Sequence, residues 1–315
     1  MSDLIALFVH ETGLGEHDIR KIVATAPARY KTYAIKKRNG IDRRIISQPA
    51  RELKLLQRTL IDAVLKNLPV HRSATAYRTG MSIIDNVRPH INSGAILKLD
   101  FSDFFPSLRE SDWREYCVRN EIFRSEEDIE VSGLVLFKKE RQRRELRLSI
   151  GAPSSPIVSN ILMFDIDSEI ESKIVSEEVV YTRYADDMTF SARRTGFLNK
   201  VEKNVREILR GSQSLRLQLN DDKTVYATKK YKRQVTGLII TNDATVSVGR
   251  ERKRNLMAAI HAALSGKLSG DQVRETLGMV SFVISVEPDF KKRIERKNGE
   301  DALALLSKLA STKGT

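Results

Sequence analysis

Hydrophobic positions in the first 95 residues follow helical spacing, with one short exception. Leu53, Leu56 and Leu60 recur three and four residues apart, which predicts a helix over this stretch. Residues 30–36 and 43–47 flank a polar, glycine-containing segment, and this arrangement predicts a hairpin. We therefore expect a helical N-terminal region that carries one two-stranded element.

Strand patterns dominate the middle of the chain. Residues 96–100 form an apolar run that ends on a carboxylate, which predicts a buried strand. Residues 179–184 and 188–191 predict a strand pair, and residues 236–240 and 245–248 predict a further hairpin. The spacing of apolar residues predicts helices in the segments 109–137, 256–264, 277–283 and 302–309. The order helical, strand-rich, helical indicates a mixed α+β protein.

Charge narrows the classes of partner. The chain has 315 residues, of which 54 are Lys or Arg and 41 are Asp or Glu, so its formal net charge is +13. Such an excess favours polyanions, either nucleic acid or an anionic membrane, although solubility alone also explains a charged surface. Because only 6% of residues are aromatic, stacking on many bases is not the expected mode of binding.

Membrane and secretory signals are not apparent in the sequence. No apolar run approaches the length of a membrane span. The N-terminus carries Asp3 and Glu11 and no early basic residue, which argues against a signal peptide. Cys117 is the only cysteine, so neither an intrachain disulfide nor a cysteine-based zinc site is possible. We expect a cytoplasmic protein that does not enter a membrane.

Three acidic residues are candidates for metal-dependent chemistry. Asp100 ends the predicted central strand, and Asp186 and Asp187 occupy the turn of the predicted strand pair. Each feature alone is ordinary, since Asp-Asp is common in turns. Together, three carboxylates at strand ends can hold two Mg²⁺ ions for in-line phosphoryl transfer.

Four segments in this order resemble the conserved boxes of reverse transcriptases. They are Leu-Asp-Phe-Ser-Asp-Phe-Phe at 99–105, Gly-Ala-Pro-Ser-Ser-Pro at 151–156, Tyr-Ala-Asp-Asp at 184–187 and Asn-Asp-Asp-Lys-Thr at 220–224. The resemblance implies a right-hand polymerase fold with fingers, palm and thumb. It implies fingers at 1–95 and 113–150, a palm at 96–112 and 151–240, and a thumb that binds RNA at 241–315.

The resemblance also implies roles for residues of the site. The ligands of two Mg²⁺ ions would be Asp100, Phe101, Asp186 and Asp187. Lys223 matches a lysine proposed as general acid to the pyrophosphate, although a surface lysine is the alternative. The deoxynucleoside triphosphate would contact Arg44, Lys54, Phe101, Phe105, Gly151 and Ala152. In that set Phe105 would exclude a 2′-hydroxyl, and Arg44 and Lys54 would grip the triphosphate unless they are simply solvated.

Two further segments are similar to bacterial retron reverse transcriptases. They are Asn-Val-Arg-Pro-His at 86–90 and Val-Thr-Gly-Leu at 235–238. The resemblance implies an RNA-directed DNA polymerase that primes on an internal guanosine 2′-OH of its own structured noncoding RNA. The product would be branched multicopy single-stranded DNA (msDNA), in antiphage defence with an effector protein. The predicted RNA-binding residues are Asn86, His90, Val235, Thr236, Gly237, Arg250, Arg252, Lys253 and Arg254.

Several alternatives remain open on the sequence. His90 is as easily a hydrogen-bonding structural residue, and residues 235–238 can be a plain strand in which Gly237 admits another backbone. The basic runs at 138–147, 229–233 and 291–297 are either RNA-binding faces or solvated surface. The whole protein could instead be a defence reverse transcriptase of the abortive-infection type, or an antitoxin scaffold that binds RNA and DNA.

Overall fold

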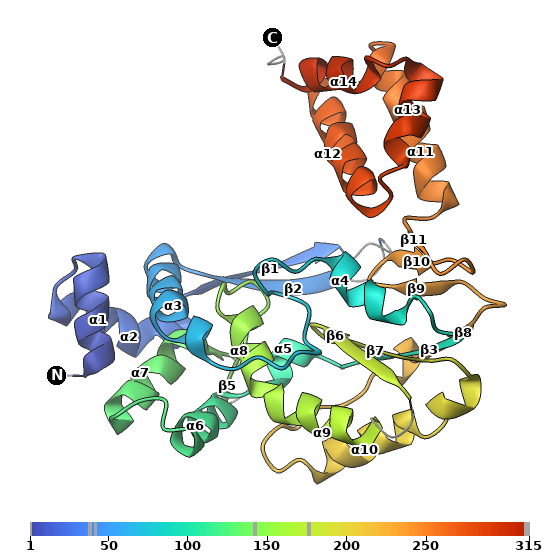
Figure 1. Cartoon of the computed structure of the whole chain (residues 1–315). Coiled ribbons are helices and arrows are strands. Elements are labelled where there is room, and N and C mark those ends of the chain that lie inside the picture. The colour runs from blue at the N-terminus through green and yellow to red at the C-terminus, as the bar shows by residue number, and fades with distance from the viewer. Residues whose placement is uncertain (1, 37–39, 41–42, 141–143, 175–177, 312–315) are drawn as a thin grey trace.

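A four-stranded antiparallel sheet lies at the centre of the protein. The computed structural model describes residues 2–36, 40, 43–140, 144–174 and 178–311 (Figure 1). The strand order is β6-β7-β3-β8. The strands are β3 (Ala95–Asp100), β6 (Val180–Tyr184), β7 (Asp187–Ala192) and β8 (Val225–Thr228). The strands predicted at 96–100, 179–184 and 188–191 are therefore confirmed.

Strand β3 is buried because it is central in the sheet and covered by helices. Five of its six residues are buried, and Lys98 is half-buried. Helices α9 (Phe164–Ile174) and α10 (Val201–Gly211) pack on each other and lie along the sheet (Figure 1). The apolar run that the sequence shows here is what a strand covered on both faces requires.

A helical region precedes and flanks the sheet. Its larger helices are α1 (Asp3–Thr12), α2 (Glu16–Thr25), α3 (Arg51–Ala63), α6 (Glu110–Arg119) and α7 (Glu126–Leu136). The apolar faces of these helices join the sheet in one hydrophobic core. Leu53, Leu56 and Leu60 are buried in it, so the predicted helical stripe of α3 is confirmed. Three shorter helices complete the region: α4 (Ile83–Val87), α5 (Phe104–Ser107) and α8 (Ser155–Leu162).

Two strand pairs lie in the helical region. The predicted hairpin is present as β1 (Tyr30–Lys36) and β2 (Arg43–Pro49). The basic run at 138–147 contains the second pair, β4 (Lys138–Lys139) and β5 (Leu146–Arg147), with residues 141–143 outside the described part.

The ends of this basic run are tied to the protein rather than freely solvated. Lys138 Nζ donates to Ser47 Oγ at 2.7 Å, and Arg147 Nη1 donates to the Pro106 carbonyl at 2.5 Å. Burial lowers the pKa of Lys138. The prediction of a solvated face is therefore wrong for these two side chains.

A three-stranded antiparallel sheet follows the central sheet in the chain. It contains β9 (Arg233–Val235), β10 (Leu238–Ile240) and β11 (Val246–Ser247). Thr236 and Gly237, predicted as strand, form the two-residue turn between β9 and β10, with φ of 44° and 82°. Turns of this kind need positive φ at both positions, which explains the glycine. Among described residues, no atom lies within 4 Å of the point where a Gly237 Cβ would stand, so close backbone approach is not its reason.

Four helices form the C-terminal region. They are α11 (Arg250–Leu264), α12 (Gly270–Val286), α13 (Phe290–Asn298) and α14 (Ala302–Ser311). They stand apart from the helical region at the N-terminus (Figure 1) and share a second hydrophobic core with the three-stranded sheet. The predicted boundary at residue 240 therefore falls inside that sheet. Among the helices of the described residues, none is long and apolar enough to span a membrane.

Candidate active site

The three candidate carboxylates lie at one end of the central sheet. Asp100 is the last residue of β3 and stands directly opposite Asp187, the first residue of β7. Asp186 precedes Asp187 in the tight turn that joins β6 to β7. Because the register pairs these strand ends, residues more than 80 positions apart in the chain become neighbours.

The backbone around this end of the sheet is strongly constrained. Ala185 has a φ of 58°, a left-handed conformation that costs an L residue about 1–2 kcal/mol. The Phe101 amide donates to the Asp186 carbonyl at 3.3 Å, and the Asn220 amide donates to the Asp100 carbonyl at 2.8 Å. The first bond ties the turn to the residue after β3, and the second ties the end of β3 to the segment at residue 220.

The carboxylates strongly influence one another. Burial and the charge of Asp100 raise the pKa of Asp186. Burial is also the first cause that raises the pKa of Asp187, to about 6, and the neighbouring Asp100 and Asp186 act in the same direction. Lys223 Nζ contacts Asp100 Oδ1 at 2.6 Å. Burial acts to lower the pKa of Lys223, but the hydrogen bond with Asp100 and the charges of Asp100, Asp186 and Asp187 together outweigh it, and the pKa is raised. The site therefore gathers negative charge that a cation relieves.

The donor set fits a hard divalent cation. Carboxylate and carbonyl oxygens are the ligands that Mg²⁺ prefers, and the site offers Asp100, Asp186, Asp187 and the Phe101 carbonyl. Within the described ranges, no cluster of three or more His, Cys, Asp or Glu side chains forms a ready-made cage. Asp100 is instead engaged by Lys223. An incoming cation must therefore compete with that amine for Asp100.

A cavity of about 380 Å³ is lined by Tyr77, whose ring lies 6.5 Å from that of Tyr184 at the end of β6, but the three carboxylates are not part of its lining. Four of the predicted nucleotide-binding residues line it: Lys54, Phe105, Gly151 and Ala152. Arg44 lies on β2 outside this lining, but its charge acts on Asp186 and Tyr77. Phe101 is buried, with its ring stacked on Phe104 at 5.5 Å, so only its backbone is available to a ligand. A nucleotide contact at Phe101, as predicted, would therefore have to be made by its backbone.

Gly151 is required by its close contact with β2. Its φ is 116°, and a Cβ at this position would meet Ile46 Cγ2 at 2.9 Å and the Ser47 carbonyl oxygen at 3.1 Å. The Ser47 amide also donates to the Ile150 carbonyl at 2.7 Å. The glycine thus lets this loop dock on the strand that carries Arg44.

Tyr77 belongs to the site and was not predicted from the sequence. Its ring lies 6.5 Å from the rings of Phe105 and Tyr184, and it lines the same cavity. Tyr77 has a φ of 62°, a conformation unusual for a bulky residue and concentrated at functional sites. The isolated tyrosine carries no signal of this kind in the sequence, because the conformation arises only in the fold.

Two predicted RNA-binding residues are fully buried. Asn86 Oδ1 accepts a hydrogen bond from Thr75 Oγ1 at 2.8 Å. The His90 ring contacts Ser191 Oγ at 2.6 Å and Thr182 Oγ1 at 2.8 Å. Burial lowers the pKa of His90 to about 3, so it is neutral. Direct RNA contact by Asn86 and His90 is therefore contradicted, and the structural alternative for His90 is the one observed.

The remaining predicted RNA-binding residues fall into two groups. Val235 is buried in the second core, and Lys253 Nζ is paired with Glu287 at 2.6 Å, so neither presents a free side chain. Within the run 229–233, Arg233 is also buried, and its guanidinium donates to the Ser93 and Thr241 carbonyls. A cavity of about 1200 Å³ between the three-stranded sheet, α11 and α12 is lined by Gly237, Arg250 and Arg252, and also by the paired Lys253 and the buried Arg233. Arg254 is exposed on the same helix.

Thr236 differs from both groups, because its side chain contacts helix α4. Its Oγ1 donates to the Ile83 carbonyl at 3.4 Å, which connects the β9–β10 turn to helix α4. The residue is half-buried, so part of its surface remains available to a ligand.

The class of protein follows from this site and a comparison of the sequence with protein families. Residues 35–240 match the family model described as reverse transcriptase (RNA-dependent DNA polymerase). The match spans all four boxes and every residue that lines the 380 Å³ cavity. The chain belongs to the reverse transcriptase family and is an RNA-directed DNA polymerase.

Within that family, the chain is a retron reverse transcriptase. It is 35% identical to the retron Ec83 reverse transcriptase of Escherichia coli, over 92% of this chain and 94% of that one. It is 32% identical to the retron Ec86 reverse transcriptase of E. coli, over 93% and 89% of the two chains. The retron Mx162 reverse transcriptase of Myxococcus xanthus is 31% identical over 90% of this chain and 61% of its own length.

Solved structures agree on the fold. A telomerase from Candida albicans superposes with a TM-score of 0.50 at 13% identity, covering 92% of this chain and 59% of the telomerase. At this identity the similarity concerns the fold alone. The mixed helical and antiparallel architecture is that of a right-hand polymerase, as the sequence predicted.

Proposed function

We propose that this retron reverse transcriptase copies part of its own structured noncoding RNA into DNA. Synthesis begins on the 2′-hydroxyl of an internal guanosine and gives branched, RNA-linked multicopy single-stranded DNA. The enzyme uses deoxynucleoside triphosphates and two Mg²⁺ ions. It acts in the cytoplasm in antiphage defence together with an effector protein. The observation that carries the catalytic part is the register that pairs Asp100 with Asp187 beside Asp186.

The residues around the cavity support each step of DNA synthesis. Asp100, Asp186, Asp187 and the Phe101 carbonyl would hold the metal ions. The chemistry that such ions supply is activation of the attacking hydroxyl and stabilisation of the pyrophosphate that leaves. The Phe105 ring lines the cavity and would exclude a 2′-hydroxyl. Lys54 at the cavity and Arg44 on β2 would neutralise the triphosphate.

Lys223 is suited to a proton transfer role. Its ammonium group already contacts Asp100 Oδ1 and is half exposed. Asp100 would be a ligand of a bound cation, and Lys223, no longer needed as its partner, would be placed to donate a proton to the pyrophosphate. The domain assignment of fingers, palm and thumb also stays a proposal, with the three-stranded sheet grouped with the thumb.

Basic groups around the 1200 Å³ cavity support recognition of a structured RNA. Arg250, Arg252 and Lys229 contribute positive charge there, and the exposed Arg254 extends it along α11. Phosphate contacts of this kind suit an RNA that is read by its shape. The single cysteine, Cys117, is buried, which fits a reducing compartment.

The test is isolation of the product from cells that carry the native locus. The nucleic acid bound to the purified protein is treated separately with RNase A, DNase and a debranching enzyme. A DNase-sensitive band that debranching shifts is expected. Asp186→Asn should remove it, while Asp222→Asn, an exposed acid in the neighbouring turn, should leave it.

Other outcomes identify the alternatives. DNA without a branch, still dependent on Asp186, would point to a defence reverse transcriptase of the abortive-infection type. Full phage defence by the Asp186→Asn variant, with no DNA made, would point to an antitoxin scaffold instead.

A further inference from the structure

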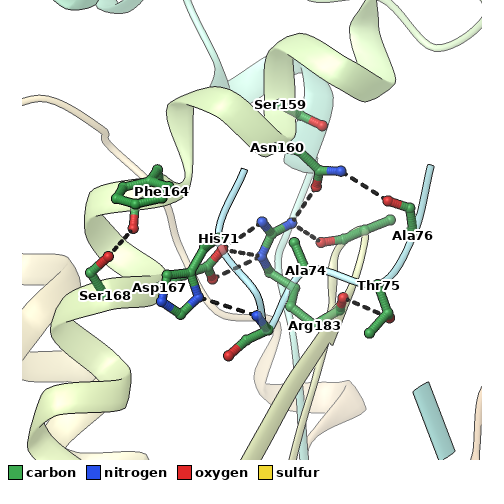
Figure 2. Close-up of polar contacts among 12 residues, drawn as sticks. His71, Ala74, Thr75, Ala76, Ser159, Asn160, Phe164, Asp167, Ser168 and Arg183 are labelled. Carbon is green, nitrogen blue, oxygen red and sulfur yellow. Dashed lines mark hydrogen bonds and ion pairs between the residues drawn. The ribbon is translucent and has the colours of Figure 1, made fainter. Parts of the chain in front are cut away.

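A fully buried guanidinium lies beneath the turn that carries Asp186. Arg183, on β6, has 0% of its side chain exposed and sits among segments distant in sequence (Figure 2). Its Nε and Nη2 atoms donate to the two carboxylate oxygens of Asp167, at 2.9 Å and 2.7 Å. Tyr181 also donates to Asp167, at 2.7 Å. The charge of Arg183 is therefore balanced inside the protein by a carboxylate on α9.

The remaining nitrogen of this guanidinium holds the turn itself. Arg183 Nη1 donates to the Ala185 carbonyl at 3.0 Å and to Asn160 Oδ1 at 3.2 Å. Ala185 is the residue in the left-handed conformation, which an alanine adopts only when its surroundings impose it. Its carbonyl belongs to the peptide unit that leads into Asp186. The guanidinium thus fixes the peptide from which the catalytic carboxylates project.

The backbone of Arg183 also holds the segment that leads to Tyr77, which lines the cavity. The Arg183 amide donates to the Ser73 carbonyl at 2.7 Å, and its carbonyl accepts from the Thr75 amide at 2.8 Å. Asn160 Nδ2 donates to the Ala76 carbonyl at 2.9 Å (Figure 2). Residue 77 follows immediately, so the position of the Tyr77 ring beside Phe105 depends on this segment.

We propose that Arg183 is a positioning residue for DNA synthesis, which sets Asp186 and Asp187 for the metal ions and the 73–77 segment for the nucleotide. The expected effect on DNA synthesis rests on the proposed function, whereas the contacts of Arg183 do not depend on it. A planar guanidinium can bind a carboxylate with two nitrogens and still direct a third, which the single amine of lysine cannot do. Arg183→Lys keeps the positive charge but cannot make the contacts with Asp167, Asn160 and the Ala185 carbonyl at the same time.

The first experiment measures metal binding directly. Mn²⁺ bound to the purified full chain is titrated by electron paramagnetic resonance, for the wild type, Arg183→Lys and Tyr181→Phe. Arg183→Lys should weaken Mn²⁺ binding about 10–100-fold, the usual effect of removing a group that orients a ligand. Tyr181→Phe is the matched control, because it removes a hydrogen bond to the same Asp167 without touching Ala185, and should bind as the wild type does.

Steady-state kinetics separate positioning from loss of folded protein. Arg183→Lys should lower kcat while KM for deoxynucleotide stays near the wild-type value. A folded Arg183→Lys variant with wild-type Mn²⁺ affinity and kcat overturns the proposal.

A second variant covers the case in which a lysine at this position prevents folding. The triple change Arg183→Met, Asp167→Leu and Tyr181→Phe replaces the ion pair and its phenol by apolar groups, which buried ion pairs often tolerate. It should fold and show the same weakened Mn²⁺ binding. If it folds and binds Mn²⁺ normally, Arg183 does not position the carboxylates and the proposal is overturned. If neither variant folds, Arg183 is a requirement of folding and not a positioning residue.

Failure of the proposed function is distinguishable from these results. A wild-type protein that binds Mn²⁺ in an Arg183-dependent way but makes no DNA on its own RNA would refute the function and leave the positioning role intact.

Discussion

The active-site turn and the C-terminal helices are held in opposite ways. The turn that carries Asp186 rests on buried polar groups, with Arg183, Asp167 and Asn160 satisfied by one another. Helices α11–α14 are held by a separate apolar core and carry much of their charge on the surface. Chemistry needs atoms fixed to a fraction of an ångström, whereas attraction to phosphates depends mainly on how much positive charge a surface carries. Substitutions in the active-site region should therefore change catalysis, whereas substitutions on the C-terminal surface should change the salt dependence of RNA binding.

The largest effect in this comparison is expected at Phe105 in the rigid region. Phe105→Ala should reduce discrimination against ribonucleotides about 10–100-fold, because space opens where the 2′-hydroxyl would stand. The measurement is the ratio of kcat/KM for deoxynucleotide and ribonucleotide. Phe105→Tyr keeps the bulk and should retain the discrimination. An unchanged ratio in the alanine variant would remove Phe105 from the sugar site.

The next effect concerns stability and pH. His90 has a folded-state pKa near 3 and an unfolded value near 6.5. Between these values only the unfolded chain takes up the proton, so stability falls as the pH falls below 6.5. The loss approaches about 1.4 kcal/mol per pH unit, or about 2 kcal/mol at pH 5.

His90→Gln should show a smaller loss between pH 7 and pH 5, measured by urea denaturation. Glutamine retains hydrogen-bonding capacity toward Thr182 and Ser191 but does not titrate. A variant that loses stability as steeply as the wild type would assign the acid sensitivity to other groups.

The smallest effect is expected on the C-terminal surface. Arg250→Gln and Arg254→Gln should each reduce the slope of log affinity against log salt for RNA, by about 0.7–0.9 for each phosphate that the variant no longer neutralises. Lys253→Gln is the informative comparison on the same helix. Because Lys253 is paired with Glu287, its replacement should lower Tm and leave the salt slope unchanged. Equal salt effects from all three would contradict the division between paired and free charges.

The sequence predicted that the three candidate carboxylates lie at strand ends, because each is part of a contiguous motif at the end of a clear strand pattern. It did not predict Arg183 as an anchor, because its partner Asp167 lies on another element and their contact arises only in the tertiary fold. Motif resemblance also could not reveal exposure. Asn86, His90 and Val235 occupy motif positions, yet all three side chains are buried in the protein.

Some secondary structure was missed for equally physical reasons. Helix α13 has only two buried apolar positions, Phe290 and Ile294, among many charged ones, so its stripe is short. The turn at Thr236 and Gly237 has only two residues and lies directly between the apolar residues Val235 and Leu238, so the pattern gives little sign of it. In both cases tertiary contacts decide what local periodicity leaves ambiguous.

Strand β3 is shared by the two hydrophobic cores. Ile96 belongs to the core of the C-terminal helices, while Leu97 and Leu99 belong to the core of the remainder. Alternate side chains of a strand face opposite directions, so one short segment links both cores and ends at Asp100. If a ligand bound on the C-terminal side shifts this strand, it changes the affinity of the carboxylate end for its own ligand by a fixed factor. By thermodynamic linkage, the ligand at the carboxylate end then changes the affinity of the C-terminal side for its ligand by that same factor.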